Sequence, residues 1–325
     1  MKPARPTKLL ALVAASLLPA ALLEAQQKPD ITVDVDLVTV ACAVANREGA
    51  PQNDLRREDF DLRDDGQPRE IRNFWRESDL PLTVALVADV SGSQLGFVKS
   101  HRQALAQFLG QVIGPRDRAM VVEVAQQART ISDLSGSLAD LGAAVEKIGS
   151  PEGRQSPLLG PSCRNDRFPH TCGGTALWHG LYYAVKNLKP VAGSKAVVVL
   201  SDGLDTGSDI GLNDLIEMAQ SAGVVVYSIK YANPMRFVSV TGAIAQALSH
   251  GLERLSRETG GLTFPNPGHA TSEVFSRIES DLRNMYVLGF TPPAETRDGK
   301  FHKLDVKIVS RDLAVRTRAG YWALQ

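Results

Sequence analysis

Residues 82–93 read LTVALVADVSGS, and this stretch decides the fold of the chain. The apolar run at 82–88 has the length and composition of a buried strand. It ends at Asp89, and Ser91 and Ser93 follow at alternate positions. In open α/β sheets, ligands bind beyond the carboxyl ends of the strands. A carboxylate and two hydroxyls at this point therefore predict a binding loop.

Two later segments complete the same pattern. A second apolar run, 196–200, is closed by Ser201-Asp202-Gly203, and Gly173-Gly174-Thr175 opens a helix-like segment. Hard oxygen ligands without His or Cys suit Mg²⁺, with Mn²⁺ or Ca²⁺ as alternatives. Taken singly, each residue also has a local interpretation, because serines cap helices and an Asp can open a turn. The predicted metal ligands are Asp89, Ser91, Ser93, Thr175 and Asp202.

The order of strand and helix patterns predicts the fold class. Between residues 80 and 285 the two patterns alternate, which predicts an α/β, doubly wound, mostly parallel sheet covered by helices. The expected strands are 82–88, 120–125, 196–200, 224–229 and 261–264, with a short antiparallel edge at 129–131. The expected helices are 97–113, 138–148, 176–188, 212–222, 244–259 and 271–285.

Both ends of the chain carry strand patterns of their own. Residues 31–78 alternate apolar and polar positions, and Asp65-Gly66 predicts a hairpin between strands at 59–62 and 70–74. Residues 286–325 return to strands. Neither segment has enough strands to close a core alone. We therefore expect the two to form one small β-sandwich, into which the α/β domain is inserted.

The composition excludes several classes of protein. Lys+Arg and Asp+Glu are balanced at 36 each, so no basic excess is present to neutralise the phosphates of a nucleic acid. Hydrophobic residues make up 43% of the chain, which is enough for a full core. The sequence has no Gly-x-Ser-x-Gly elbow, no phosphate-binding P-loop and no His/Cys cluster with zinc spacing.

The N-terminus has the pattern of a secretory signal. Lys2, Arg5 and Lys8 precede an apolar run at 9–23 that is too short and too Pro-interrupted for a good membrane span. We expect cleavage after Ala25, a signal peptide at 1–25, and a secreted, periplasmic or cell-surface protein without a stable membrane span. The competing interpretation is an uncleaved N-terminal anchor.

Export would place the cysteines in an oxidising environment. Cys163 and Cys172 lie close together in a Pro/Gly-rich loop, and we expect them to form a disulfide worth about 2–3 kcal/mol in the chain-entropy model. Cys42 shares strand parity with its apolar neighbours, which predicts a buried free thiol. Intermolecular pairing of this odd cysteine is the alternative.

The metal motif resembles the metal-ion-dependent adhesion site of a von Willebrand factor type A domain. Asp89-Val90-Ser91-Gly92-Ser93, Thr175 and Asp202 match the positions of that site one for one. The resemblance covers about 200 residues and implies ligands that bind the ion directly or through water. The flanking segments, among them 286–290 and 298–303, resemble the secreted bacterial VWFA-related domain family described from acidobacteria. That resemblance implies a fold and a metal site, and no particular partner.

Two carboxylates roughly neutralise a divalent ion and leave it electrophilic toward one more oxygen. We expect a protein partner to supply that oxygen from an Asp or Glu carboxylate, which makes the chain a non-enzymatic, metal-dependent binding module. A metal-assisted hydrolase, or a structural envelope subunit with a purely structural metal, are the alternatives. The loop at 150–171 is either a specificity loop or a tolerated insertion. The expected partner-binding rim is Gln94, Arg164, Asp166 and Asp205.

Overall fold

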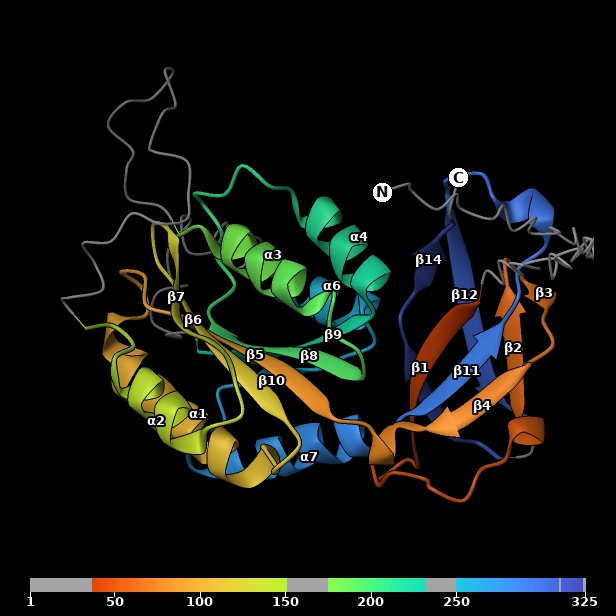
Figure 1. The fold of residues 1–325 in the computed structure, drawn as a ribbon, viewed down its shortest axis with the longest axis horizontal. Coiled ribbons are helices and arrows are strands. Elements are labelled where there is room, and N and C mark those ends of the chain that lie inside the picture. Colours follow the sequence, from red (N-terminus) through yellow and green to blue (C-terminus); the bar gives the residue numbers. More distant parts are fainter. Residues whose placement is uncertain (1–36, 151–174, 232–249, 310, 324–325) are drawn as a thin grey trace, which may run out of the picture. The chain divides into compact units, whose positions relative to one another are not determined.

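The computed structural model describes residues 37–150, 175–231, 250–309 and 311–323, which belong to one compact unit, Asp36–Gln325. Their strands form one six-stranded sheet and two four-stranded sheets (Figure 1). The predicted signal peptide and the predicted Cys163–Cys172 disulfide lie outside the described residues.

The six-stranded sheet confirms the predicted α/β class. Its strand order is β10-β9-β8-β5-β6-β7, and all neighbouring strands are parallel except β6 and β7. The predicted antiparallel edge is therefore present, and it is longer than expected. The strands are β5 (Leu82–Asp89), β6 (Arg118–Val124), β7 (Ala128–Ser135), β8 (Ser194–Ser201), β9 (Val224–Lys230) and β10 (Thr263–Pro265).

Helices cover both faces of this sheet (Figure 1). One face packs against α1 (Val98–Val112), α2 (Leu138–Glu146) and α7 (Thr271–Arg283), and the other against α3 (Leu177–Leu188), α4 (Leu212–Ala222) and α6 (Gly251–Glu258). In β5, Val84 and Leu86 face the first group of helices, while Ala85 and Val87 face the second. Because side chains alternate along a strand, a strand covered on both faces must be apolar throughout.

The two four-stranded sheets confirm the composite β-sandwich. Their orders are β13-β1-β11-β4 and β14-β12-β2-β3, so each sheet combines strands from both ends of the chain. The core between them includes Phe60, Phe74 and Tyr286, whose ring centroids lie 5.2–5.6 Å apart. The strands are β1 (Val38–Ala45), β2 (Phe60–Asp64), β3 (Gln67–Pro68), β4 (Asn73–Arg76), β11 (Tyr286–Phe290), β12 (Phe301–Ile308), β13 (Ala314–Thr317) and β14 (Gly320–Trp322).

The predicted hairpin is correct in its turn and wrong in its second strand. The Asp65-Gly66 turn joins β2 to the short β3, and β4 pairs instead with β11 of the opposite sheet. The reason lies in the core, where the Phe74 ring of β4 stacks on Tyr286 of β11. Short 3-10 helices lie at Arg57–Asp59, Glu77–Asp79, Leu95–Phe97, Gly268–Ala270 and Ala294–Thr296.

Cys42 lies in the core of the sandwich, as predicted. Its side chain is fully buried in β1, and the thiol is free. Burial raises the pKa of the Cys42 thiol to about 12, so the thiol is neutral and unreactive at neutral pH.

Candidate metal centre

The register of the central strands brings the two predicted carboxylates to the same edge of the sheet. In the β5–β8 ladder Ala88 lies opposite Leu200, so Asp89 at the end of β5 adjoins Ser201 and Asp202 at the end of β8. Both carboxylate residues are buried, with 0% of Asp89 and 4% of Asp202 exposed. The two residues are far apart in the sequence, and the parallel pairing of β5 with β8 brings them together.

The first loop folds around the Asp89 carboxylate. Oδ1 accepts a hydrogen bond from the Ser91 backbone N–H at 2.9 Å, and the Ser91 and Ser93 hydroxyls lie 3.2 Å apart. Oδ2 accepts a hydrogen bond from the Ser201 hydroxyl at 2.5 Å. The sequence did not mark Ser201 as part of the site, although it precedes Asp202 directly.

The second and third segments are tied to each other by backbone hydrogen bonds. The Thr175 carbonyl accepts from the N–H groups of Thr206 and Gly207, both at 3.0 Å. The Thr175 N–H in turn donates to the Thr206 hydroxyl at 3.0 Å. Asp202 Oδ1 accepts from the Leu204 N–H at 3.1 Å, which shapes the loop after β8. Thr175, which is 7% exposed, therefore starts the approach to α3 from a fixed position beside the Asp202 loop.

The surroundings of the Asp89 carboxylate disfavour its negative charge. Burial raises the pKa of Asp89 to about 6, hydrogen bonds from Ser201 and Ser91 oppose that rise, and the nearby charge of Asp202 adds to it. The hydrogen-bond donors to Asp89 in the described structure are thus neutral groups, while a second carboxylate lies close by. Two neighbouring buried carboxylates are costly unless a cation balances them. The donor set of carboxylates and hydroxyls, without imidazole or thiol, fits a hard divalent ion such as Mg²⁺.

Buried side chains pack beneath the loop that follows Asp89 and hold it in place. Gln94 was predicted on the partner-binding rim, but only 1% of it is exposed, and its amide donates to the Tyr231 carbonyl at 2.9 Å. In this structure Gln94 holds the loop to the end of β9 and does not face a partner. His101 in α1 is 0% exposed and packs edge-on against the Tyr231 ring, and burial lowers its pKa to about 4.

Asp205 also has a local role. Its Oδ1 accepts from the Trp178 N–H at 3.0 Å and from the Ser208 hydroxyl at 2.5 Å. A carboxylate that accepts from the first turn of α3 acts as a cap supplied by a neighbouring loop. Arg164 and Asp166, the other expected rim residues, lie outside the described residues.

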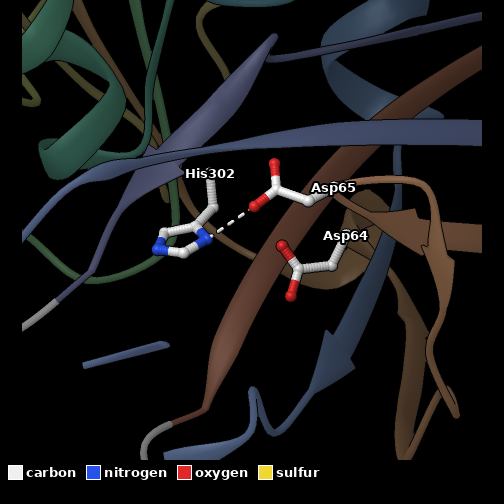
Figure 2. Close-up of side chains that lie close together, drawn as sticks. All are labelled: Asp64, Asp65 and His302. Carbon is white, nitrogen blue, oxygen red and sulfur yellow. Dashed lines mark hydrogen bonds and ion pairs between the residues drawn. The ribbon is translucent and has the colours of Figure 1, made fainter. Parts of the chain in front are cut away.

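A second group of metal-ligating residue types lies in the β-sandwich, where the sequence predicted none. Asp64, Asp65 and His302 each offer one ligand atom, and these atoms lie within 4.8 Å of one another. Figure 2 shows both carboxylates facing the His302 imidazole. The sequence carried a partial signal, because Asp65-Gly66 and Asp298-Gly299 mark two turns. Nothing local shows that β2 and β12 pair and bring these turns together.

Comparisons with known proteins concern the fold. No protein-family model matches the sequence, and no curated protein matches it. The structure is similar to BatB from Bacteroides thetaiotaomicron, at 13% identity over 61% of this chain and 97% of that chain, with a TM-score of 0.44. It is also similar to the vWF domain of the type V pili tip protein Mfa5 from Porphyromonas gingivalis, at 14% identity, 62% and 94% coverage, and a TM-score of 0.42. A third similar structure is the PilB minor pilin from Streptococcus sanguinis, at 14% identity, with 62% of each chain covered and a TM-score of 0.41.

The α/β part of this chain is a mostly parallel six-stranded sheet with helices on both faces. Among the described residues, no helix is long and apolar enough to cross a membrane.

Proposed function

We propose that this chain is a metal-dependent protein-binding module. In this proposal Asp89, Ser91, Ser93, Thr175 and Asp202 hold a divalent cation, with Mg²⁺ as the first candidate and Mn²⁺ or Ca²⁺ as alternatives. The observation that carries the proposal is the convergence of the buried Asp89 and Asp202 carboxylates at the ends of the paired strands β5 and β8.

The chemistry of such an ion leads to binding of an acidic group. Two carboxylates balance the charge of a divalent cation, and the hydroxyls add neutral oxygen ligands. Mg²⁺ prefers six oxygens and keeps the remaining positions for water or for an incoming oxygen. A partner's Asp or Glu carboxylate is the protein group that suits such a position. The carboxylates and hydroxyls of the site would all serve as ligands, so none is left as a general base, and we propose a non-enzymatic role.

The setting of the module is part of the same proposal. The N-terminal pattern supports export to the periplasm, the cell surface or the medium. The balance of 36 basic and 36 acidic residues supports a protein partner over a nucleic acid. The Cys163–Cys172 disulfide stays a prediction that would stiffen the segment preceding Thr175.

Isothermal titration calorimetry with Mg²⁺ and Mn²⁺ tests the site. Wild-type protein should bind about one ion per chain, and Asp89→Ala and Asp202→Ala should each abolish the binding, because each removes a carboxylate ligand. Asp133→Ala is the matched control, since Asp133 is an exposed carboxylate on β7. Unchanged affinity in both site variants would refute the assignment.

A capture experiment tests the function. Immobilised full-length chain should retain a protein from envelope extract in the presence of Mg²⁺, and should release it when EDTA is added. The Asp89→Ala variant should not retain that protein. Capture that persists in EDTA would contradict a metal-bridged carboxylate. If the metal raised the stability of the fold but capture were the same with and without it, the metal would have a purely structural role.

A further inference from the structure

Three acceptor atoms converge in the β-sandwich at the turn between β2 and β3. Asp64 ends β2 and Asp65 follows it in the turn, while His302 projects from β12, the neighbouring strand. One ligand atom from each of these residues lies within 4.8 Å of the other two. The cluster belongs to a different sheet from Asp89 and Asp202.

Hydrogen bonds hold each of the three side chains in place. His302 Nε2 lies 3.1 Å from Asp298 Oδ1, Asp65 Oδ1 accepts from the Lys303 N–H at 2.8 Å, and Asp64 Oδ2 accepts from Arg69 Nε at 3.0 Å. The His302 ring is further fixed by stacking on Tyr321, with centroids 5.4 Å apart. Metal-binding histidines characteristically donate their second ring N–H to a carboxylate, which orients the free nitrogen toward the ion.

The described residues leave one acceptor beside the His302–Asp65 pair without a donor. His302 Nδ1 lies 2.9 Å from Asp65 Oδ2, so the two atoms share a proton when no metal is bound. Asp64 Oδ1 is a third acceptor, and it is buried without a hydrogen-bond partner among the described residues. A single proton between His302 and Asp65 leaves this oxygen unsatisfied, and a buried unpaired carboxylate oxygen is unfavourable. A divalent cation held by one atom of each residue would place a positive charge beside this buried carboxylate.

We propose that Asp64, Asp65 and His302 form a second divalent cation site, and that its ion is of the Zn²⁺ type. An imidazole nitrogen with two carboxylate oxygens matches the mixed donors that Zn²⁺ accepts, whereas Mg²⁺ prefers oxygen alone. The side chains of Asp64 and His302 are 1% and 8% exposed, and that of Asp65 is 53% exposed, so water can provide the fourth ligand. With zinc bonds of about 2.0–2.2 Å at tetrahedral angles, the ligand atoms would lie roughly 3.3–3.6 Å apart. Metal binding would therefore separate His302 Nδ1 and Asp65 Oδ2, now 2.9 Å apart, and the exposed Asp65 side chain has room for that shift.

The experiment is a Zn²⁺ titration of untagged full-length protein that carries Asp89→Ala and Asp202→Ala. Those substitutions remove the β5–β8 site, so the result is independent of the function proposed above. This parent should bind about one Zn²⁺ per chain, and its apparent melting temperature should rise as Zn²⁺ is added. Adding His302→Gln should abolish both effects. Adding Asp298→Asn, which keeps an Oδ1 acceptor for the Lys300 N–H but removes the carboxylate charge beside His302, should weaken binding by about 10- to 100-fold.

Two further variants make the outcome decisive. His250→Gln is the matched control, because His250 is an exposed histidine (67%) that pairs with Glu253 away from the sandwich cluster. Asp65→Asn covers the case in which His302→Gln fails to fold. Asp65 has φ +50°, a conformation that Asn tolerates well, so this variant keeps the turn while removing a ligand charge. The proposal would be overturned if the parent did not bind Zn²⁺. It would also be overturned if the His302→Gln and Asp65→Asn variants both bound Zn²⁺ with the affinity of the parent. His302 would then be a protonated ion-pair partner of Asp65 and Asp298.

Discussion

Ser201→Ala should weaken metal binding at the β5–β8 edge without removing any predicted ligand. The Ser201 hydroxyl donates to Asp89 Oδ2 at 2.5 Å and accepts from the Gly203 N–H at 3.0 Å. It therefore fixes the rotamer of Asp89 and the first step of the loop that carries Asp202. Loss of an outer-shell hydrogen bond of this kind typically costs 10- to 100-fold in metal affinity, or about 1.4–2.8 kcal/mol.

The same substitution should also lower stability in the absence of metal. It leaves the buried Gly203 N–H without its acceptor and Asp89 Oδ2 without its donor. An unsatisfied buried group costs about 1–3 kcal/mol, so urea unfolding in EDTA should show a loss in at least this range. The matched control is Ser135→Ala at the end of β7, where the hydroxyl likewise accepts from the N–H two residues ahead, at 3.1 Å, but lies outside the metal site.

Calorimetry with Mn²⁺ and urea unfolding in EDTA separate the two effects. Ser135→Ala should lower stability slightly and leave the Mn²⁺ affinity at the wild-type value. If Ser201→Ala loses stability but binds Mn²⁺ within about twofold of wild type, the reasoning is refuted. Ser201 would then support the loop without orienting the ligand.

Three further predictions concern stability. Burial alone would raise the pKa of Asp117, but hydrogen bonds from Arg283 and two backbone amides lower it below its ordinary value. This stabilisation is complete above the unfolded pKa near 4 and is lost as pH falls through the lower folded value, so Asp117→Asn should show a shallower loss of stability as pH falls below about 4 in urea unfolding. Gly180→Ala should destabilise by about 1–3 kcal/mol, because its Cβ would lie 2.3 Å from a methyl group of β6, whereas the control Gly110→Ala meets nothing within 4 Å and should be neutral or stabilising. Deleting Tyr286–Gln325 removes strands from both sandwich sheets and should abolish amide protection in β1 and β2, while the α/β domain stays folded; retained protection in β1 and β2 would contradict a composite sandwich.

The α/β sheet was predictable because its signals are local. Each buried parallel strand is a continuous apolar run, and each covering helix repeats with a helical period. Leu212–Ala222 was predicted with the bounds of α4, since the helix ends at Gly223, which takes the left-handed φ of +63°. The carboxylates of the predicted metal centre follow from the same signals, because the ends of adjacent parallel strands must share one edge of the sheet.

The sandwich was predictable only in part, because its pairings join residues far apart in the sequence. Asp65-Gly66 gave the turn correctly, but nothing near residue 73 indicates that β4 pairs with β11. The short β14 was not predicted at all, since Gly320–Trp322 is too brief to show an alternation.

The Asp64, Asp65 and His302 cluster depends on the same long-range pairing. The antiparallel β2–β12 ladder places Leu304 opposite Asp64, and hence His302 near the Asp65 turn. Sequence spacing rules for metal sites look for ligands within one loop or one helix, so they cannot find ligands that two distant strands supply. In the parallel sheet, the apolar strand runs alone predict which residues lie at the sheet edge. In the antiparallel sandwich, the strand partners are distant in the sequence, so the local pattern does not predict which residues meet. In such a fold the sign of a metal site is a buried acceptor without a donor, and among the described residues Asp64 Oδ1 is such an acceptor.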